Sequence, residues 1–556
     1  MARLDQLASA KAVAQLGATL GREFAYALLR AVAPMDELEL WRGLGQLVQA
    51  EVLYQRGALP QATYLFKHAL IQDAAYQSLL KSTRQHYHQR IAQVLAAQFP
   101  ETTATQPELL ARHYTEAGLQ AQALPYWHQA GQRAIARSAY AEAYQHLTTG
   151  LEVLATVPET PARHQHELDL LTALNLVLRV TKGYGVPELE SGLTRAEALS
   201  QQVGDLPQRF AVLLGLWSFR ITRTEFQTAH AVAEQLLDLA QRQRDPTLLL
   251  RAHYVLGQSL YEVGAFALAR THLEQGIALS NLQPPATPHT TPWWEAQNLG
   301  VRCRAVGARI LWELGYPDQA VQWSQEALTM AHTLARPYDL VDMLLESANL
   351  HRRRREWQMM QAHVEAGLAL ATEHGFARYV VLGSLLRGMV LAAQGQAVEG
   401  IVQMRQGLAA LRAAGIAGGV PTFLTHLAAA YGQVGQVDEG LYLLAEALAV
   451  VDTTGGRDYE AESHRLHGEF LLQQPVPDAP AAEASFQQAL AVARRQQAKS
   501  LELRAATSLA QLWQRQGKRA EAHALLAPIY GWFTEGFDTA DLLDAQTLLS
   551  TLATEP

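Results

Sequence analysis

A predicted pair of helices at residues 426–448 constrains the fold of this chain more than any other stretch. Its sequence is HLAAAYGQVGQVDEGLYLLAEAL, with small residues at Ala428, Gly440 and Ala447, where two packed helices must touch. Gly435 separates the two halves, because glycine readily ends a helix. Tight packing of two short helices joined by a glycine turn predicts a helical hairpin.

The same spacing recurs along most of the chain. We take the small or apolar residue late in the second helix as a marker, and it falls at Ala196, Leu236, Gly276, Ala327, Gly367, Gly407, Ala447, Ala489 and Ile529. Neighbouring markers are 40 residues apart, except for intervals of 51 and 42 that contain proline-rich insertions at 281–292 and 474–480. Hairpins of this design are tetratricopeptide-like (TPR-like), although the usual period is about 34.

Such a register predicts a mostly all-α fold, because one hairpin cannot bury its apolar face and stacked hairpins can. The array should be an α-solenoid with a period near 40 and a concave groove. A terminal repeat needs a cap, and the end of the chain offers aromatic side chains to plug the stack, followed by a final helix that can start at Asp538 or Thr539. These aromatic residues are Tyr530, Trp532, Phe533 and Phe537.

The N-terminal segment lies outside the register. Helical periodicity predicts three helices, the third capped by Asp36, and then a β-hairpin formed by VLYQRG and TYLFKH. Three helices followed by a hairpin is the order of a winged-helix module. We therefore expect a winged-helix-like module at 1–72, a helical junction with the first TPR-like hairpins at 73–170, and the superhelical array with its capping helix at 171–556.

A winged helix suggests DNA binding, but the charge of the third helix has the wrong sign for it. Asp36, Glu37, Glu39 and Glu51 surround a single basic residue, Arg42. Phosphate contacts require lysine or arginine. Packing against other domains is the preferred interpretation, and a DNA-binding transcriptional regulator with a helical-repeat sensor is the alternative.

The sequence offers no constellation typical of catalysis. Phosphate-binding, dinucleotide-binding and nucleophile-elbow motifs are missing, and Ser78 and Lys81 match S-x-x-K without its companion motifs. His164 and His166 have the wrong spacing for a metal pair on a helix. We expect no enzyme activity, no cofactor and no metal site. A net charge of -8, a single cysteine and the lack of an apolar span or signal peptide predict a cytoplasmic protein.

The groove is the better candidate for a site. In TPR-like hairpins the first helix lines the concave face, which groups four arginines with three aromatic residues. The predicted contacts for a ligand or partner are Arg251, Tyr254, Gln258, Tyr261, Arg302, Arg309, Trp312, Asn349 and Arg352. Arginine pairs bidentately with carboxylate or phosphate, so we expect a protein, an acidic peptide or a small anionic ligand. The alternative is that these arginines pair with acids of the array itself, such as Glu262 or Glu313. The run 352–355 is expected to be a solvated helix end.

Several stretches together resemble a known family. They are MARLDQL, VAQLGATLGREFAYALLRAV, YLFKHALIQDAAYQSLLKSTRQHYHQRIA, LLARHYTEAG and WFTEGFDTADLLDA. They are similar to the C-terminal half of large bacterial proteins that join a class III adenylate/guanylate cyclase, a signal-transduction ATPase with numerous domains (STAND) and a TPR-like array. The resemblance covers essentially the whole chain.

The resemblance implies a regulatory sensor and protein-interaction role in signal transduction, with upstream ATPase and cyclase domains as partners. It also implies that the winged helix follows the ATPase domain and that the array senses a ligand or partner. The cyclase and nucleotide-binding motifs have no counterpart here, so we expect a non-catalytic fragment or free-standing remnant. A fragment of an adenylate cyclase, with ATP binding assigned only by inheritance, is the third alternative.

Overall fold

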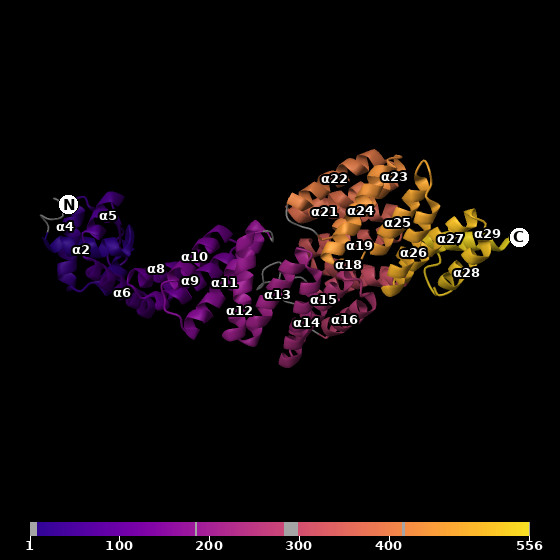
Figure 1. Ribbon diagram of the computed structural model, residues 1–556. Coiled ribbons are helices and arrows are strands. Elements are labelled where there is room, and N and C mark those ends of the chain that lie inside the picture. The colour runs from indigo at the N-terminus through magenta and orange to yellow at the C-terminus, as the bar shows by residue number, and fades with distance from the viewer. Residues whose placement is uncertain (1–7, 184–185, 283–297, 414–417, 555–556) are drawn as a thin grey trace. The chain divides into compact units, whose positions relative to one another are not determined.

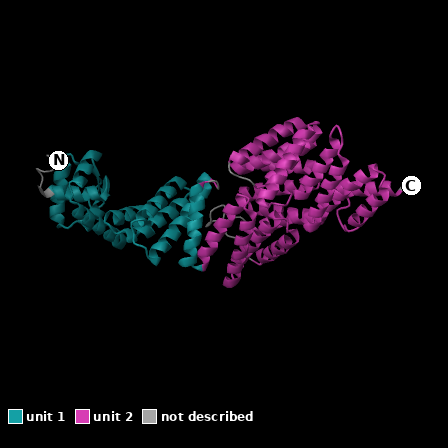
Figure 2. Ribbon diagram, viewed as in Figure 1, with its two compact units in different colours: residues 1–182, 187–205 teal, residues 183–186, 206–556 magenta. Residues whose placement is uncertain are grey.

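The computed structural model is almost entirely helical (Figure 1). It describes residues 8–183, 186–282, 298–413 and 418–554. The chain divides into two compact units, residues 1–182 with 187–205, and residues 183–186 with 206–556 (Figure 2). Within the described residues, no helix is both long and apolar enough to cross a membrane.

The first unit begins with three helices and a small antiparallel sheet whose strand order is β1-β3-β2. The elements are α2 (Ala8–Leu20), β1 (Glu23–Ala25), α3 (Tyr26–Val32), α4 (Glu37–Gln49), β2 (Leu53–Arg56) and β3 (Thr63–Phe66). The β2–β3 hairpin is present as predicted, with Tyr54 opposite Leu65. Asp36 caps α4 by accepting a 2.8 Å hydrogen bond from the Glu39 amide. The short strand β1 between the first two helices was not predicted.

Eight further helices complete the first unit. They are α5 (Ala69–Gln77), α6 (Lys81–Gln98), α7 (Pro100–Thr105), α8 (Pro107–Glu116), α9 (Gln120–Ala136), α10 (Tyr140–Leu154), α11 (Pro161–Lys182) and α12 (Pro187–Gln202). The expected domain boundaries after residues 72 and 170 fall inside α5 and α11. Buried His88 and His113 form a hydrogen bond of 2.8 Å between their Nδ1 atoms, and Tyr76 Oη lies 2.9 Å from His88 Nε2.

The second unit is a stack of helical hairpins. Its helices are α13 (Leu206–Thr222), α14 (Phe226–Gln243), α15 (Pro246–Glu262), α16 (Phe266–Asn281), α17 (Leu299–Glu313), α18 (Pro317–Leu334), α19 (Pro337–Arg353), α20 (Trp357–Glu373), α21 (Ala377–Ala393), α22 (Ala397–Ala413), α23 (Val420–Gln433), α24 (Val437–Thr454), α25 (Glu460–Gln473), α26 (Ala479–Arg495), α27 (Lys499–Arg515), α28 (Arg519–Tyr530) and α29 (Ala540–Thr554). Consecutive helices pack in pairs. All nine marker residues lie buried on second helices, from α12 to α28.

The hairpin at 426–448 forms as predicted from α23 and α24. Ala428 and Ala447 are fully buried, and Gly435 in the turn has a φ of +77°. Gly440 has a further role, because a Cβ there would lie 2.0 Å from Cε2 of Phe470 on α25. The small residue therefore makes room for the next hairpin in the stack.

The C-terminal cap matches the prediction in part. Phe533 is buried in the apolar core of the last helices, and α29 begins directly after Thr539. Trp532 and Phe537 are 37% and 47% exposed. Trp532 instead faces an earlier repeat, with its ring centroid 5.7 Å from that of Tyr316.

Candidate functional site: the first-helix surface

The first helices of successive hairpins touch one another and form a continuous layer, which we call the first-helix surface. We use this name for α15, α17, α19, α21 and α23, and the layer continues through α25 and α27. All nine predicted contact residues lie on three neighbouring helices of this layer, α15, α17 and α19. The register therefore placed these residues on adjacent helices, and the structure shows their polar partners.

Arg302 occupies the middle of this group and is paired on both sides. Its Nε and Nη2 donate to Tyr254 Oη at 3.2 and 3.0 Å. Its Nη1 donates to Asp342 Oδ2 and lies 3.9 Å from Glu346 Oε1. Burial lowers the pKa of Arg302, but attraction to Asp342, Tyr254 and Glu346 together outweighs it and raises this pKa above its usual value. This arginine thus carries an anionic partner supplied by the next repeat.

Arg309, about two turns further along α17, makes looser contacts. Its guanidinium lies 4.6 Å from the Tyr261 ring centroid, and its Nε lies 3.4 Å from Glu346 Oε2. Within the described residues, neither Arg309 Nε nor Glu346 Oε2 makes a hydrogen bond. Glu346 is the carboxylate that Arg302 and Arg309 share. An unbonded donor beside an unbonded acceptor marks this pair as the least satisfied part of the surface.

The α15 side of the surface holds a buried carboxyl group. Gln258 Nε2 donates to Glu262 Oε1 at 2.6 Å. Burial, together with the nearby Asp458 carboxylate, raises the pKa of Glu262 to about 8. Arg251 lies half-buried on the same helix. The side-chain hydrogen bond that Glu262 accepts therefore comes from Gln258 rather than from one of the predicted arginines.

Arg352 and Asn349 lie at the C-terminal end of α19. Arg352 Nη1 donates to Tyr459 Oη at 2.9 Å and lies 2.5 Å from His426 Nε2. Asn349 donates to the Leu345 carbonyl at 3.2 Å and accepts from Arg352 Nε at 3.4 Å. Burial lowers the pKa of His426 well below its usual value, so the imidazole accepts a hydrogen bond without adding charge beside the arginine.

The prediction that the run 352–355 is a solvated helix end was wrong for its first three arginines, and Arg355 alone of the four is exposed. Arg352, Arg353 and Arg354 are only 3%, 4% and 7% exposed. Arg353 donates to Glu313 Oε1 at 3.1 Å and to Tyr261 Oη at 2.8 Å. The arginines are buried because helices distant in sequence pack over the end of α19, which a local helical pattern does not reveal.

Three of the predicted contacts are covered by residues from much later in the chain. Tyr261 Oη donates to Asp458 Oδ2 at 3.4 Å. The guanidinium of Arg504 on α27 lies 4.8 Å from the Trp312 ring centroid. Arg352 is covered by Tyr459. The repeat register predicts contacts between neighbouring hairpins only, so sequence reasoning missed all three covering residues.

One part of the surface that stays open is a small hollow of about 60 Å³. Polar groups of α19 line one side and apolar side chains of α21 and α23 line the other. The lining residues are Asp342, Leu345, Glu346, Asn349, Tyr379, Leu382, Leu386 and Phe423. The apolar wall was not predicted. The hollow is large enough for about two water molecules, or for a small aliphatic group.

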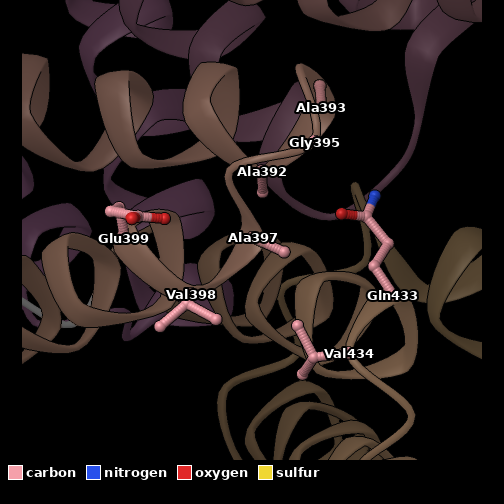
Figure 3. Close-up of a pocket in the computed structure, with 8 residues that line it drawn as sticks. All are labelled: Ala392, Ala393, Gly395, Ala397, Val398, Glu399, Gln433 and Val434. Atoms are coloured by element: carbon pink, nitrogen blue, oxygen red, sulfur yellow. The ribbon is translucent and has the colours of Figure 1, made fainter.

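A second hollow, of about 330 Å³, lies where the α21–α22 turn meets the end of α23 (Figure 3). Its lining is mostly small and apolar, with Glu399 as the one charged residue among the lining side chains. None of the predicted contact residues lines it. Within the described residues, no group of three or more metal-ligating side chains is present.

Comparisons with known proteins support the fold. No family model matches the chain. A curated protein of Rhizobium meliloti (strain 1021), itself uncharacterized, is 24% identical over 519 residues, which cover 92% of this chain. The match covers 49% of that protein, so the chain spans about half the length of the curated relative it matches.

Among solved structures, one similar fold has a TM-score above 0.5, and two others match less well. A Rap protein complexed with competence and sporulation factor has a TM-score of 0.51 at 11% identity, covering 68% of this chain and 99% of that chain. A STAND protein with a tetratricopeptide repeat sensor from Pyrococcus horikoshii has a TM-score of 0.36 at 9% identity, with coverages of 72% and 62%. The Cut9–Hcn1 hetero-tetramer has a TM-score of 0.42 at 14% identity, with coverages of 94% and 97%. The chain is a TPR-like helical-repeat solenoid.

Proposed function

We propose that the protein is a non-catalytic, cytoplasmic sensor and protein-interaction part of a bacterial signal-transduction system, acting beside STAND ATPase and cyclase domains. The TPR-like fold supports a binding role, because stacked hairpins present extended surfaces to partners. The related Rhizobium protein is about twice as long as the matched region, which is consistent with additional domains. No reaction is assigned to these residues.

We further propose that the partner is an acidic peptide segment, or a small anion, held on the first-helix surface. The single observation that carries this proposal is the shared carboxylate: Glu346 serves both Arg302 and Arg309 at 3.9 and 3.4 Å. Two guanidinium groups with long contacts to one carboxylate have donors left for a second one. A ligand carboxylate would take the place of Glu346, and its apolar neighbour would fill the hollow beside Leu386.

The experiment measures binding of a hexaglutamate peptide by isothermal titration calorimetry at low salt. R302Q/R309Q removes both charges and keeps hydrogen-bonding groups, so we expect affinity to fall at least tenfold. The matched control is R387Q/R412Q, because these two arginines form exposed ion pairs with Glu365 and Glu446 elsewhere on the array. Circular dichroism confirms that both variants fold. Equal affinity of the two variants would refute the acidic-ligand proposal.

For the N-terminal segment we propose a winged-helix-like module that packs against another domain. Its support is the order of three helices and a hairpin, together with the acidic exposed side of α4, where Glu37 and Glu39 are exposed. Arg30 is neutralised by Glu37 at 3.1 Å. The transcriptional-regulator alternative requires duplex DNA binding that weakens steeply with salt, and such binding would replace this proposal.

A further inference from the structure

We propose that the C-terminal part of the array, residues 457–554, is a cover that closes over the first-helix surface and regulates access to it. The regulatory role of the cover rests on the proposed function, whereas the contacts that hold the cover in place do not depend on any ligand. In an ordinary solenoid each repeat touches only its neighbours. Here contacts at sequence separations of 151 to 218 residues join the cover to α15–α19.

The first anchor of the cover is Glu535, which caps the N-terminus of α18. Its Oε1 accepts from the backbone amides of Asp318 and Gln319 at 2.9 and 3.1 Å, and its Oε2 accepts from Gln319 Nε2 at 3.0 Å. The Gly536 amide donates back to Asp318 Oδ2 at 3.0 Å. The first amides of a helix lack partners in the helix itself, so a carboxylate from a distant segment satisfies them and complements the helix dipole.

The second anchor joins Arg355, just after α19, to the start of α29. Arg355 Nη1 lies 2.6 Å from Asp544 Oδ2 and 3.4 Å from Asp541 Oδ1. Arg504 on α27 donates to Asp541 at 2.8 Å and to the Arg353 carbonyl at 2.5 Å. Arg355 and Asp544 are 42% and 53% exposed, so water can replace their contact when the cover moves.

The central contact is a backbone hydrogen bond between the cover and α15. The Arg457 amide donates to the Glu262 carbonyl at 2.8 Å. Gln496 fixes this segment by donating to the Arg457 carbonyl at 2.7 Å. Beside this contact, the Asp458 carboxylate accepts a hydrogen bond from the Tyr261 hydroxyl. The cover thus contacts the first-helix surface at the predicted site itself.

The contacts that join the cover to α15–α19 are mostly polar, with Trp532 packed against Tyr316 as an apolar exception, whereas the interior of the cover is apolar. The last helices, α26–α29, have a separate core that includes Phe486, Leu509, Leu526 and Phe533. Moving α26–α29 away from α15–α19 would break mainly hydrogen bonds and ion pairs that water can replace, without opening that core, while α25 stays joined to α23 and α24 through the buried ring of Phe470. Net contributions of such bonds are small compared with apolar burial. The cover can therefore separate while its helices stay folded.

The cover also contributes carboxylates where an acidic ligand would bind. Asp458 lies against Tyr261, and Glu462 lies 3.8 Å from Arg504, whose guanidinium covers Trp312. These side chains act as an internal substitute for the ligand. Binding of an acidic partner and closure of the cover are then competing events, and each weakens the other to the same extent.

The test loosens both anchors with E535Q/D544N in the full chain and measures amide hydrogen exchange. The decisive amide is that of Arg457. It lies far from both substitutions in sequence, and its hydrogen-bond partner is the Glu262 carbonyl of α15, outside the cover. We expect its exchange rate to rise at least tenfold, while amides within α19 keep their protection. E373Q/E521Q, which changes two exposed acids outside the anchors, should leave the Arg457 amide unchanged.

Hexaglutamate binding to the same variants separates this inference from the proposed function. Faster Arg457 exchange together with tighter peptide binding supports both. Faster exchange with unchanged peptide binding supports the cover and contradicts the acidic ligand. Unchanged Arg457 exchange in folded E535Q/D544N overturns the cover. Loss of protection in α19 as well would mean that the closure is part of the folding core, which also overturns it.

Discussion

At the scale of single residues, the first-helix surface shows how repeat proteins pair buried charges. Arg302 contacts Asp342, and Glu313 contacts Arg353, and both pairs are separated by 40 residues. Equivalent positions on neighbouring first helices therefore carry opposite charges. The register contained this information, because a residue and its counterpart one period later lie side by side, and the pairs could have been predicted from it. The partners Asp458 and Tyr459, just before α25, and Arg504 on α27 could not, since no periodicity links them to the early repeats.

The buried histidine pair of the first unit gives a prediction about pH. Burial lowers the pKa of His88 to about 4 and of His113 to about 3. The unfolded chain, with ordinary histidine values near 6.5, binds more protons below that pH. The free energy of unfolding therefore has its full contribution from these histidines above about pH 6.5, and it falls as the pH drops toward 4.

The measurement is urea unfolding of the protein at several pH values, with amide exchange in α6 and α8 as the local probe. Each buried histidine contributes up to ~1.4 kcal/mol per pH unit below its unfolded pKa. H88Q/H113N removes both titrating groups, so the slope between pH 6.5 and 4.5 should flatten. A slope that persists unchanged in the variant would assign the pH dependence to other groups.

At the scale of elements, the hairpins were predictable because three independent constraints coincide at each one. Small residues mark the helix crossings, a glycine with positive φ marks many of the turns, and the apolar positions repeat with the helical period. The strand β1 was missed because it has three residues, Glu23–Ala25, too few for an alternating pattern. Its pairing partner β3 stabilises it, and pairing is a tertiary property that a short segment does not reveal.

Gly440 tests the packing of one hairpin on the next. In G440A the new methyl group would meet the Phe470 ring, which is only 3% exposed and would have to shift within the core. We expect a loss of ~1–3 kcal/mol in the free energy of unfolding. G45A is the control, because that position on α4 has nothing within 4 Å of a new Cβ. There the better helix propensity of alanine should leave stability unchanged or raise it by up to ~1 kcal/mol. Equal effects of the two substitutions in chemical denaturation would contradict the contact.

At the scale of the whole second unit, closure changes how the array should unfold. A linear stack can lose its terminal repeats one after another. Here the last hairpins are fastened to α15–α19, so early and late repeats should unfold together. We expect fluorine resonances of 5-fluorotryptophan at Trp312 on α17 and Trp513 on α27 to share one urea midpoint.

E535Q/D544N should separate the two midpoints. The native resonance of Trp513 should then disappear at a lower urea concentration than that of Trp312. The unmodified chain is the internal reference, since both probes report from the same sample. Separate midpoints in the unmodified chain would show that the late repeats unfold independently, and would place the cooperativity within single hairpins.

The capping of α18 by Glu535 also limits how this array can change in length. Open solenoids grow or shrink by whole hairpins, because a duplicated or deleted unit disturbs only its two neighbours. A closed turn lacks this freedom. One additional 40-residue unit between α19 and α25 would carry Glu535 past the helix end that it caps and separate Arg457 from Glu262. The number of repeats between these anchors is therefore constrained by the fold, as strictly as the identity of a buried residue.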